Sequence, residues 1–488
     1  GNPRKFSRIA RRVSRTKPIV AVKSGRSTQG VPVGHTVKRT SAPQSAVDAM
    51  FRQAGVIQVD TLDEMFDVAQ LLAHQPLPRG NRVSIVGNSD AVALIVADAA
   101  SAAGLQVTDP VSLGADANAD DFEVAIEQAI ASPDTDALVA VYVPPLNTSG
   151  EEVANVLAAV GEQSDKPIVS TFLGSEGVPV LLRVPDLLGG SAGRGSVPSY
   201  AAPESAVRAL ARVVNYAEWA AKDHGEFHIA LDHRTGDARA LVRQVLAAAP
   251  RGAILSTDQV HALLACYGID LWTWINVHSR EEAIAAGEKL GWEVVLKAGS
   301  EHLRTRPDLA HIWHNIRSAG EMGEAWDELT TWKGMRKDTK FFVQRAAADG
   351  IQVSFSVTED PLFGPLVSFG LAGAPSELLG DRSYGIPPLT DLDAEAMIRD
   401  LRSAPLLYGY RGSDAVDVDV LQDIIVRLAA MKDDLPEIAE LDLEPVLVHG
   451  KGYTALSARA KVVPSADRRG EWYVRRLSQP ASLGDTLA

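Results

Sequence analysis

Apolar residues along this chain follow two different spacings. Between residues 82 and 172, short runs rich in Val, Ile and Leu alternate with longer segments in which apolar residues recur every three or four positions. The short runs predict buried strands, and the longer segments predict amphipathic helices. Residues 82–90 are expected to form a strand that ends in a polar turn, further strands are expected at 137–143 and 168–172, and helices at 91–103, 119–131, 151–161 and 204–221. This alternation predicts a doubly wound parallel sheet, which binds ligands at the carboxyl ends of its strands, here near 87–90 and 144–147.

The last part of the chain has more strands in a different order. Strands are expected at 269–277, 292–298 and 340–345, and another begins at residue 350. One helix is expected at 256–267, with Ser256 as N-cap and Gly268 as its stop, and a second at 279–290, with Ser279 as N-cap.

The sequence Glu440-Leu441-Asp442-Leu443-Glu444 alternates acidic and apolar residues. At the two-residue period of a strand, the three carboxylates share one face. Two interpretations remain open. The strand either lies at a sheet edge with a solvated acidic face, or it holds Mg²⁺, which takes oxygen ligands and shares them with nucleotide phosphates.

Composition limits the kinds of protein this chain can be. Its 488 residues suit roughly three domains, and 46% hydrophobic with 23% charged residues predicts a globular chain with large cores. A net charge of −14 argues against general binding to nucleic acid or to an anionic membrane surface. No apolar run reaches the about 20 residues of a membrane helix. Cys266 is the only cysteine, so we expect it in the core, and we expect a reducing, cytoplasmic location.

Near the N-terminus, a basic helix at 4–15 leads into a strand at 19–22 and then a Gly-rich loop that carries His35. Such a loop can present an imidazole to a ligand; the alternative is an exposed histidine without a role. The chain begins Gly1-Asn2-Pro3, without an initiator Met. We therefore expect a fragment of a longer protein, cut within its first domain.

Strand 19–22, the sequence Lys23-Ser24-Gly25-Arg26-Ser27, the pair His35-Thr36 and the following helix resemble the NDP-forming acyl-CoA synthetases, a family related to succinyl-CoA synthetase. In that family, the His of a Ser-His-Thr-Gly motif is phosphorylated while acyl-CoA and ADP interconvert with ATP. The resemblance therefore implies that His35 is the catalytic residue. It extends to the middle region, where Asp109-Pro110-Val111-Ser112 occupies the place of the family's Asn-Pro-Val-Asp.

The resemblance continues over about 254–463 and implies an ATP-grasp domain. The matching stretches are Asp360-Pro361-Leu362-Phe363-Gly364-Pro365, Leu406-Leu407-Tyr408-Gly409-Tyr410-Arg411-Gly412 and Leu435-Pro436-Glu437-Ile438-Ala439-Glu440-Leu441-Asp442-Leu443. In such a fold, a strand lysine reaches nucleotide phosphates, a hinge strand borders the adenine and a carboxylate strand holds Mg²⁺. The implied nucleotide-binding residues are Lys297, Asp308, Val343, Gln344 and Arg345, and the implied metal ligands are Asp442 and Glu444.

Several positions depart from the family pattern around the nucleotide. Thr305 replaces a loop His, Ala310 and His311 replace two glycines, Gln352 replaces a Glu, Glu444 replaces an Asn, and Ser457 stands where a further Asp is expected. Gly34 and Val37 replace the Ser and Gly that flank the motif histidine and threonine. Loss of a carboxylate and two glycines beside a triphosphate is expected to weaken metal–nucleotide binding.

Three functions follow from these observations. The first is an active acetate–CoA-type ligase that works through a phosphohistidine at His35. The second, which the departures favour, is the nucleotide- and acyl-CoA-sensing regulatory part of a protein lysine N-acetyltransferase. That reading rests on a likeness to actinobacterial proteins that join a synthetase-like region to a GNAT-type domain. The third is a scaffold without a ligand. The implied cofactors are ATP or ADP, Mg²⁺, and CoA or acyl-CoA, and a homo-oligomer is expected.

The expected fold class is α/β, with flavodoxin-like, succinyl-CoA-ligase-type parallel-sheet domains followed by an ATP-grasp domain. The expected divisions are a truncated ligase-like subdomain at 1–75, a flavodoxin-like ligase subdomain at 76–222, a linker at 223–253, the ATP-grasp domain at 254–465 and a tail at 466–488.

Overall fold

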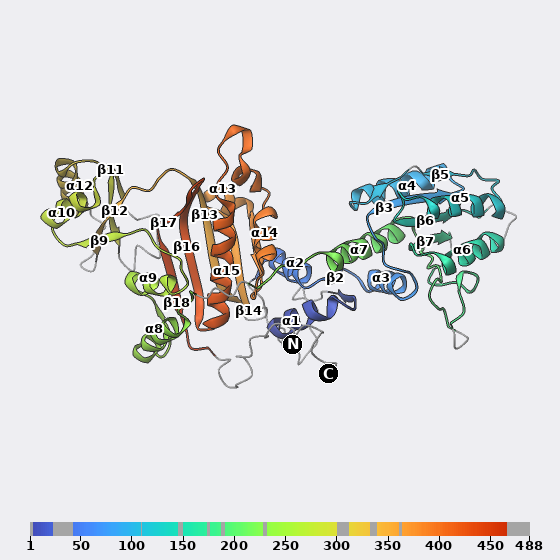
Figure 1. Ribbon diagram of the computed structural model, residues 1–488, viewed down its shortest axis with the longest axis horizontal. Coiled ribbons are helices and arrows are strands. Elements are labelled where there is room, and N and C mark those ends of the chain that lie inside the picture. Colours follow the sequence, from blue (N-terminus) through green and yellow to red (C-terminus); the bar gives the residue numbers. More distant parts are fainter. Residues whose placement is uncertain are drawn as a thin grey trace, which may run out of the picture. The chain divides into compact units, whose positions relative to one another are not determined.

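The chain forms two compact units (Figure 1), Gly1–Arg39 with Val47–Asp223, and Thr40–Ala46 with His224–Ala488. The computed structural model describes residues 3–22, 42–108, 110–144, 150–172, 176–186, 191–227, 232–299, 312–331, 339–360 and 364–465. Within these ranges, every helix is too short or too polar to cross a membrane.

The elements up to residue 221 include two parallel sheets. In chain order they are α1 (Pro3–Ser14), β1 (Ile19–Val22), α2 (Gln44–Gln53), β2 (Val56–Val59), α3 (Leu62–His74), β3 (Arg82–Gly87), α4 (Asp90–Ala102), β4 (Gln106–Val107), β5 (Val111–Ser112), α5 (Ala119–Ala131), β6 (Ala137–Tyr142), α6 (Glu151–Gln163), β7 (Ile168–Phe172) and α7 (Pro203–Ala221). Strands β1 and β2 pair with each other, and β3 to β7 form a five-stranded sheet.

The five-stranded sheet is built around β3 and β6, and all its pairings are parallel. Each residue of β6 is buried, because the two sides of the strand enter two different cores. Val139 and Val141 pack in the core that contains residues of α3, α4 and α7, whereas Leu138 and Ala140 pack in the core of α5 and α6. Helices cover both faces, as Figure 1 shows, so the predicted doubly wound sheet is confirmed.

The remaining elements form two largely antiparallel sheets. They are α8 (Thr235–Ala248), β8 (Ala253–Ile254), α9 (Thr257–Ala265), β9 (Trp274–Val277), α10 (Arg280–Leu290), β10 (Val294–Gly299), β11 (Ile312–Ile316), α12 (Ala319–Thr331), β12 (Lys340–Arg345), β13 (Ile351–Asp360), β14 (Gly364–Leu371), α13 (Ala374–Leu379), β15 (Arg382–Gly385), α14 (Asp391–Arg399), α15 (Val418–Asp434), β16 (Ile438–His449), β17 (Gly452–Ala455) and β18 (Ala458–Val462). A small sheet has the order β11-β10-β12-β9, and a seven-stranded sheet has the order β15-β14-β13-β16-β18-β8, with β17 on β16.

Each of these sheets has a core on one face. Helices α10 and α12 pack on the small sheet, and α8, α9, α14 and α15 contribute to the core of the seven-stranded sheet. Cys266 lies in that larger core with 5% of its surface exposed, as expected.

Two segments differ from the sequence-based expectation. Strand β9 begins at Trp274 rather than at residue 269, because Leu271 bridges to Ala455 and the Trp272 N–H donates to the Ala455 carbonyl at 2.8 Å. The segment 223–253, expected as a linker, contains α8, whose apolar residues Ala238, Val242 and Val245 recur every three or four positions and pack into the larger core.

Candidate functional site

Lys297 projects from the face of the small sheet opposite α10 and α12. On β10, Val294, Leu296 and Ala298 belong to the core that α10 and α12 complete. Because side chains alternate along a strand, Lys297 lies on the opposite face. The same face carries Gln344 of β12, which pairs with Val295 of β10.

A buried glutamine holds the lysine in place. Lys297 Nζ donates to Gln344 Oε1 at 2.6 Å, and Gln344 Nε2 donates to the Trp272 carbonyl at 3.0 Å. Gln344 is only 1% exposed, so these two bonds fix the orientation of its amide. Burial lowers the pKa of the Lys297 ammonium from 10.5 to about 8. An anion bound beside Lys297 would favour its charged form.

The chain at 271–274 links this face of the small sheet to the seven-stranded sheet. Trp272 Nε1 donates to the Arg345 carbonyl of β12 at 2.7 Å, and Trp272 N donates to the Ala455 carbonyl of β17. The Trp274 ring lies edge-on to His261 of α9, with the ring centroids 5.2 Å apart. The lysine-bearing face is therefore attached through Trp272 to the sheet that contains β16.

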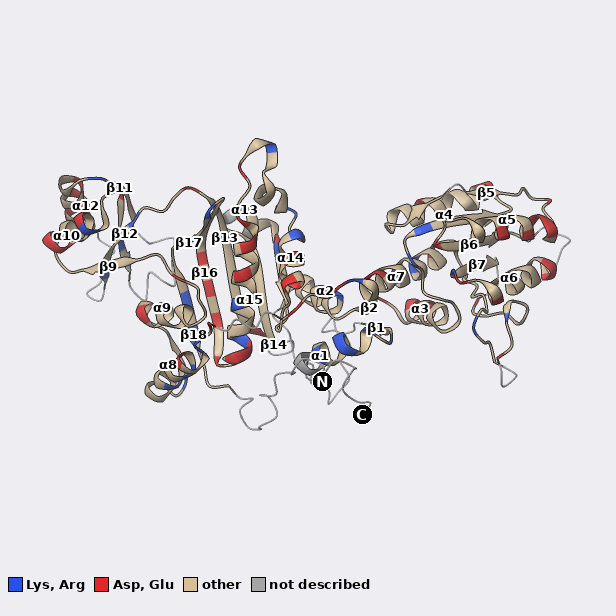
Figure 2. Cartoon of the chain, in the orientation of Figure 1, with Lys and Arg blue, Asp and Glu red and all other residues tan. Residues whose placement is uncertain are grey.

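Strand β16 presents its acids on one face, as predicted. Leu441 and Leu443 are fully buried in the larger core, so Glu440, Asp442 and Glu444 lie on the face opposite α8, α9, α14 and α15. Figure 2 shows the acidic residues as red segments along β16. The strand pairs with β13 on one side and β18 on the other, so it is an interior strand. The edge-strand interpretation is wrong.

Asp442 belongs to a row of polar side chains that crosses the sheet. The register places Tyr384, Ser368, Ser356, Asp442 and Arg459 opposite one another on five successive strands; we call this set the polar row. The hydroxyls of Ser356 and Ser368 are 2.7 Å apart. Burial raises the pKa of the Asp442 carboxyl, Glu440 raises it further, and Arg459 opposes the shift.

The acidic face fits a shared magnesium site better than a site made by protein alone. No group of three or more His, Cys, Asp or Glu within the described ranges could hold a metal by itself. Mg²⁺ commonly takes one or two carboxylates and completes its shell with phosphates and water. Asp442 and Glu444 share a face two residues apart, and the Glu444 N–H donates to the Ser457 carbonyl at 3.1 Å. Glu444 thus lies beside the position at which the family resemblance led us to expect a further Asp.

The other expected residues have different surroundings. Val343 is fully buried in the core of the small sheet, and both of its strand neighbours, Leu296 and Ile275, are paired with it. Arg345 lies exposed at the end of β12. His35 and Asp308 lie outside the described residues. The structure therefore brings Lys297 together with Gln344, and Asp442 together with Glu444.

Sequence reasoning missed Trp272 and the hydroxyl residues of the polar row. Ser356, Ser368 and Tyr384 come from three different strands, and their alignment depends on registers that no local pattern specifies. A weak signal was present in Ser354-Phe355-Ser356, where hydroxyl and aromatic residues alternate. That alternation predicts that the strand has a polar face, but it does not predict which residues of other strands lie beside it.

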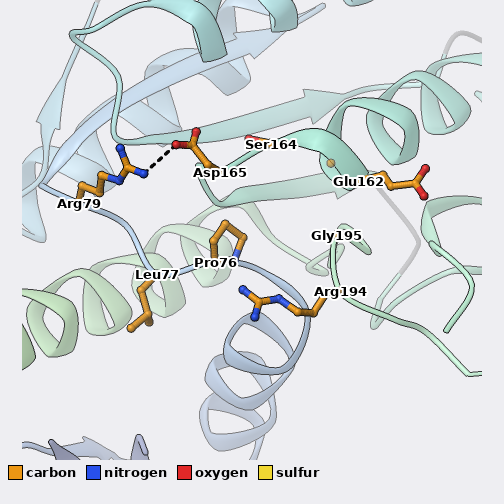
Figure 3. Close-up of a pocket in the computed structure, with 9 residues that line it drawn as sticks. Pro76, Leu77, Arg79, Glu162, Ser164, Asp165, Arg194 and Gly195 are labelled. Atoms are coloured by element: carbon orange, nitrogen blue, oxygen red, sulfur yellow. Dashed lines mark ion pairs between the residues drawn. The ribbon is translucent and has the colours of Figure 1, made fainter. Parts of the chain in front are cut away.

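A separate pocket of about 380 Å³ lies in the first unit, and Pro76, Leu77, Glu162, Arg79 and Arg194 are among its lining residues. Figure 3 shows the Arg194 guanidinium directed toward Pro76 and Leu77, while Arg79 pairs with Asp165 at 2.9 Å. Asp165 precedes β7, so the pocket lies at the amino end of that strand. Parallel sheets bind ligands at the opposite edge, and both acids and bases line this pocket. It is therefore not the candidate site.

Known proteins match both parts of the chain. Family models match an ATP-grasp domain over residues 246–462 and a succinyl-CoA ligase like flavodoxin domain over residues 1–72. The ADP-forming 4-hydroxybutyrate–CoA ligase of Nitrosopumilus maritimus is 26% identical over 496 residues, covering 94% of this chain and 68% of that protein. The beta subunit of ADP-forming acetate–CoA ligase II from Pyrococcus furiosus is 31% identical over 233 residues, 47% of this chain and 98% of that subunit. The chain belongs to the ADP-forming acyl-CoA synthetase family.

Among solved structures, this synthetase-family chain is similar to the dinucleotide forming acetyl-coenzyme A synthetase 1 of Ca. Korarchaeum cryptofilum in complex with coenzyme A, Ca-AMPCP and HgCl+. The identity is 29% and the TM-score 0.42, over 46% of this chain and 100% of that chain. The family models confirm the expected fold of a succinyl-CoA-ligase-type flavodoxin domain followed by an ATP-grasp domain. The two relatives described above are named as ligases, and the expected link to GNAT-type acetyltransferases stays a prediction.

Proposed function

We propose that this synthetase-family chain is the nucleotide-binding and phosphoryl-transferring part of an ADP-forming acid–CoA ligase. The whole enzyme would interconvert acyl-CoA, ADP and phosphate with acid, CoA and ATP. The proposal rests mainly on the bonded path from Lys297 through Gln344 and Trp272 to the sheet that presents Asp442. The names of the relatives, both ADP-forming CoA ligases, favour this function over the regulatory one.

Each polar group on the faces opposite the two cores has a role in this proposal. Lys297 would bind phosphate oxygens of ATP, and its charge would be restored by the bound anion. Asp442 and Glu444 would hold Mg²⁺, which neutralises charge on the transferring phosphoryl group. Gln344 orients Lys297. We assign the adenine side of the site to the end of β12, at Gln344 and Arg345, and a further nucleotide contact to Asp308. Val343 was expected there too, but its side chain is buried in the core on the opposite face of the sheet.

His35 is the proposed phosphoryl acceptor. The γ-phosphoryl group leaves ADP as the P–O bond breaks, and a P–N bond forms to the imidazole, whose proton passes to solvent. Ala42, seven residues later, belongs to the second unit, and its N–H donates to the buried Asp360 carboxylate at 3.1 Å. Ser45 hydrogen-bonds Tyr384 of the polar row. The assignment of His35 itself rests on the match of His35-Thr36 to the motif of the synthetase family.

The proposal is tested by incubating the protein with Mg-ATP that carries a radiolabelled γ-phosphate. We expect an acid-labile, alkali-stable label that is absent in His35→Asn and present in His278→Asn. His278 is an exposed histidine and serves as the matched control.

If no label appears, calorimetry with Mg-ATP distinguishes between the remaining functions. Binding without any label would contradict the ligase and favour a nucleotide sensor, which could then regulate an attached acetyltransferase and respond to acyl-CoA. If the protein neither binds Mg-ATP nor takes up the label, the third function, a scaffold without a ligand, is favoured.

A further inference from the structure

A fully buried lysine lies at the end of α15. Lys432 is 0% exposed, and its Nζ contacts Glu359 Oε2 at 2.7 Å, the Pro436 carbonyl at 3.3 Å and the Ile438 carbonyl. Glu359 belongs to β13, and Ile438 is the first residue of β16. A buried ammonium group is costly even when it is paired. If the side chain at position 432 only packed in the core, an apolar residue would stabilise the fold more than a lysine does.

The contact lies at the start of β16, where its pairing with β13 ends. The ladder between β13 and β16 ends at the pair Thr358–Glu440. On the other side, pairing with β18 shifts register between Ile438 and Glu440. Lys432 Nζ donates to the Ile438 carbonyl and pairs with Glu359, the residue that follows Thr358. It thus ties the first residue of β16 to β13 just past the last ladder pair.

Register decides which side chains β16 presents to a ligand. A slip of one residue exchanges the two faces of a strand, so Leu441 and Leu443 would replace Asp442 and Glu444. We propose that Lys432 is a positioning residue that fixes the register of β16 and so keeps Asp442 and Glu444 on the face opposite the larger core. The nucleotide part of this inference rests on the proposed function.

A purely stabilising role makes a different prediction. Buried ion pairs can be replaced by apolar residues of similar volume without loss of stability, and their best-attested use is to set register. Lys432→Met combined with Glu359→Gln removes both charges of this pair, so Glu359 is not left as a carboxylate without Lys432. The double variant should therefore lose little thermal stability, while the first residues of β16 become less ordered.

The experiment compares the double variant with the natural chain. We expect the Mg²⁺-dependent part of ATP affinity, measured by calorimetry with and without Mg²⁺, to fall at least about tenfold, as for other residues that support metal ligands. ATP binding without Mg²⁺ should be unchanged. Amide hydrogen exchange over residues 438–444 should accelerate. Arg239→Met is the control, because Arg239 pairs with Asp434 at the same end of α15, at 3.5 Å, and should change neither measurement.

The inference is overturned if the double variant keeps both the Mg²⁺-dependent affinity and the slow exchange. A second result would also overturn it. In that result the double variant and Lys432→Met alone both lose thermal stability, and both lose ATP affinity to the same extent with and without Mg²⁺. If the natural chain shows no Mg²⁺-dependent ATP binding, the proposed function fails. Hydrogen exchange, which needs no nucleotide, then decides the role of Lys432 alone.

Discussion

Replacing Gln344 by Glu changes the partner of Lys297 from a neutral amide to a carboxylate of nearly the same shape. Gln344 Oε1 accepts from Lys297 Nζ at 2.6 Å, so the new charge would lie directly beside the ammonium. A carboxylate at that distance raises the pKa of a lysine, because it stabilises the charged form. We therefore expect Gln344→Glu to raise the pKa of Lys297.

The size of the effect follows from the burial of the lysine. A pKa lowered from 10.5 to about 8 corresponds to ~3 kcal/mol of cost for the buried charge. It leaves about one Lys297 in ten neutral at pH 7. Since an adjacent opposite charge shifts a pKa by about 1–3 units, Gln344→Glu should return Lys297 toward its ordinary value.

The sign of the stability effect is fixed by the protons each state holds. Between pH 8 and pH 10.5 the unfolded chain keeps the Lys297 proton longer than the folded chain does, so the free energy of unfolding rises with pH in that window. Below pH 8 the cost of the buried charge is fully present. Gln344→Glu should flatten this rise.

Competitive trace labelling with acetic anhydride across a pH series, read by mass spectrometry, measures the titration of Lys297 directly. Lys340, exposed on the same strand as Gln344, gives an internal reference. Gln344→Met removes the acceptor without adding charge and should leave the pKa low. If Lys297 titrates near 10.5 in the natural chain, or if Gln344→Glu leaves the curve unmoved, the buried contact does not control this lysine.

Two further substitutions test other parts of the structure. Because burial raises the pKa of the Asp442 carboxyl and protons compete with metal for it, Mg²⁺-dependent ATP affinity should fall as pH drops through that raised value. Asp442→Asn should weaken the affinity and remove this part of its pH dependence in calorimetry; an unchanged slope would point to another group. Gly55 has φ +65° and its added Cβ would collide with the Trp219 ring, so Gly55→Ala should destabilise the first unit by more than about 1 kcal/mol in thermal unfolding. Gly104→Ala, at φ +81° with nothing near its Cβ, should cost less, and equal losses would mean that the ring contact is unimportant.

Features that depend on neighbouring residues in the sequence were predictable. The alternation of Glu440, Leu441 and Asp442 was enough to sort acidic from buried side chains, because a strand turns successive residues to opposite faces. The caps at Ser256 and Ser279 form as expected, each accepting from a backbone N–H three residues later. Such signals are local, so a single sequence contains them.

Features that depend on residues far apart were not predictable. Lys432 is followed by two aspartates in a helix, which is the usual pattern of a solvated surface. In the structure it is buried and pairs with Glu359, which is 73 positions earlier in the chain, on β13. Trp272 was expected within a strand. Its backbone N–H instead donates to the Ala455 carbonyl of the larger sheet, and strand β9 of the smaller sheet begins two residues later. The polar row likewise needs the registers of five strands. His35 and Asp308 lie outside the described residues and stay predictions.

The indole of Trp272 donates to Arg345, the residue after the glutamine that holds Lys297. Indole emission responds to the polarity and hydrogen bonding of its surroundings. A variant that keeps this tryptophan while Phe replaces the others would carry an intrinsic optical probe at the junction of the two sheets.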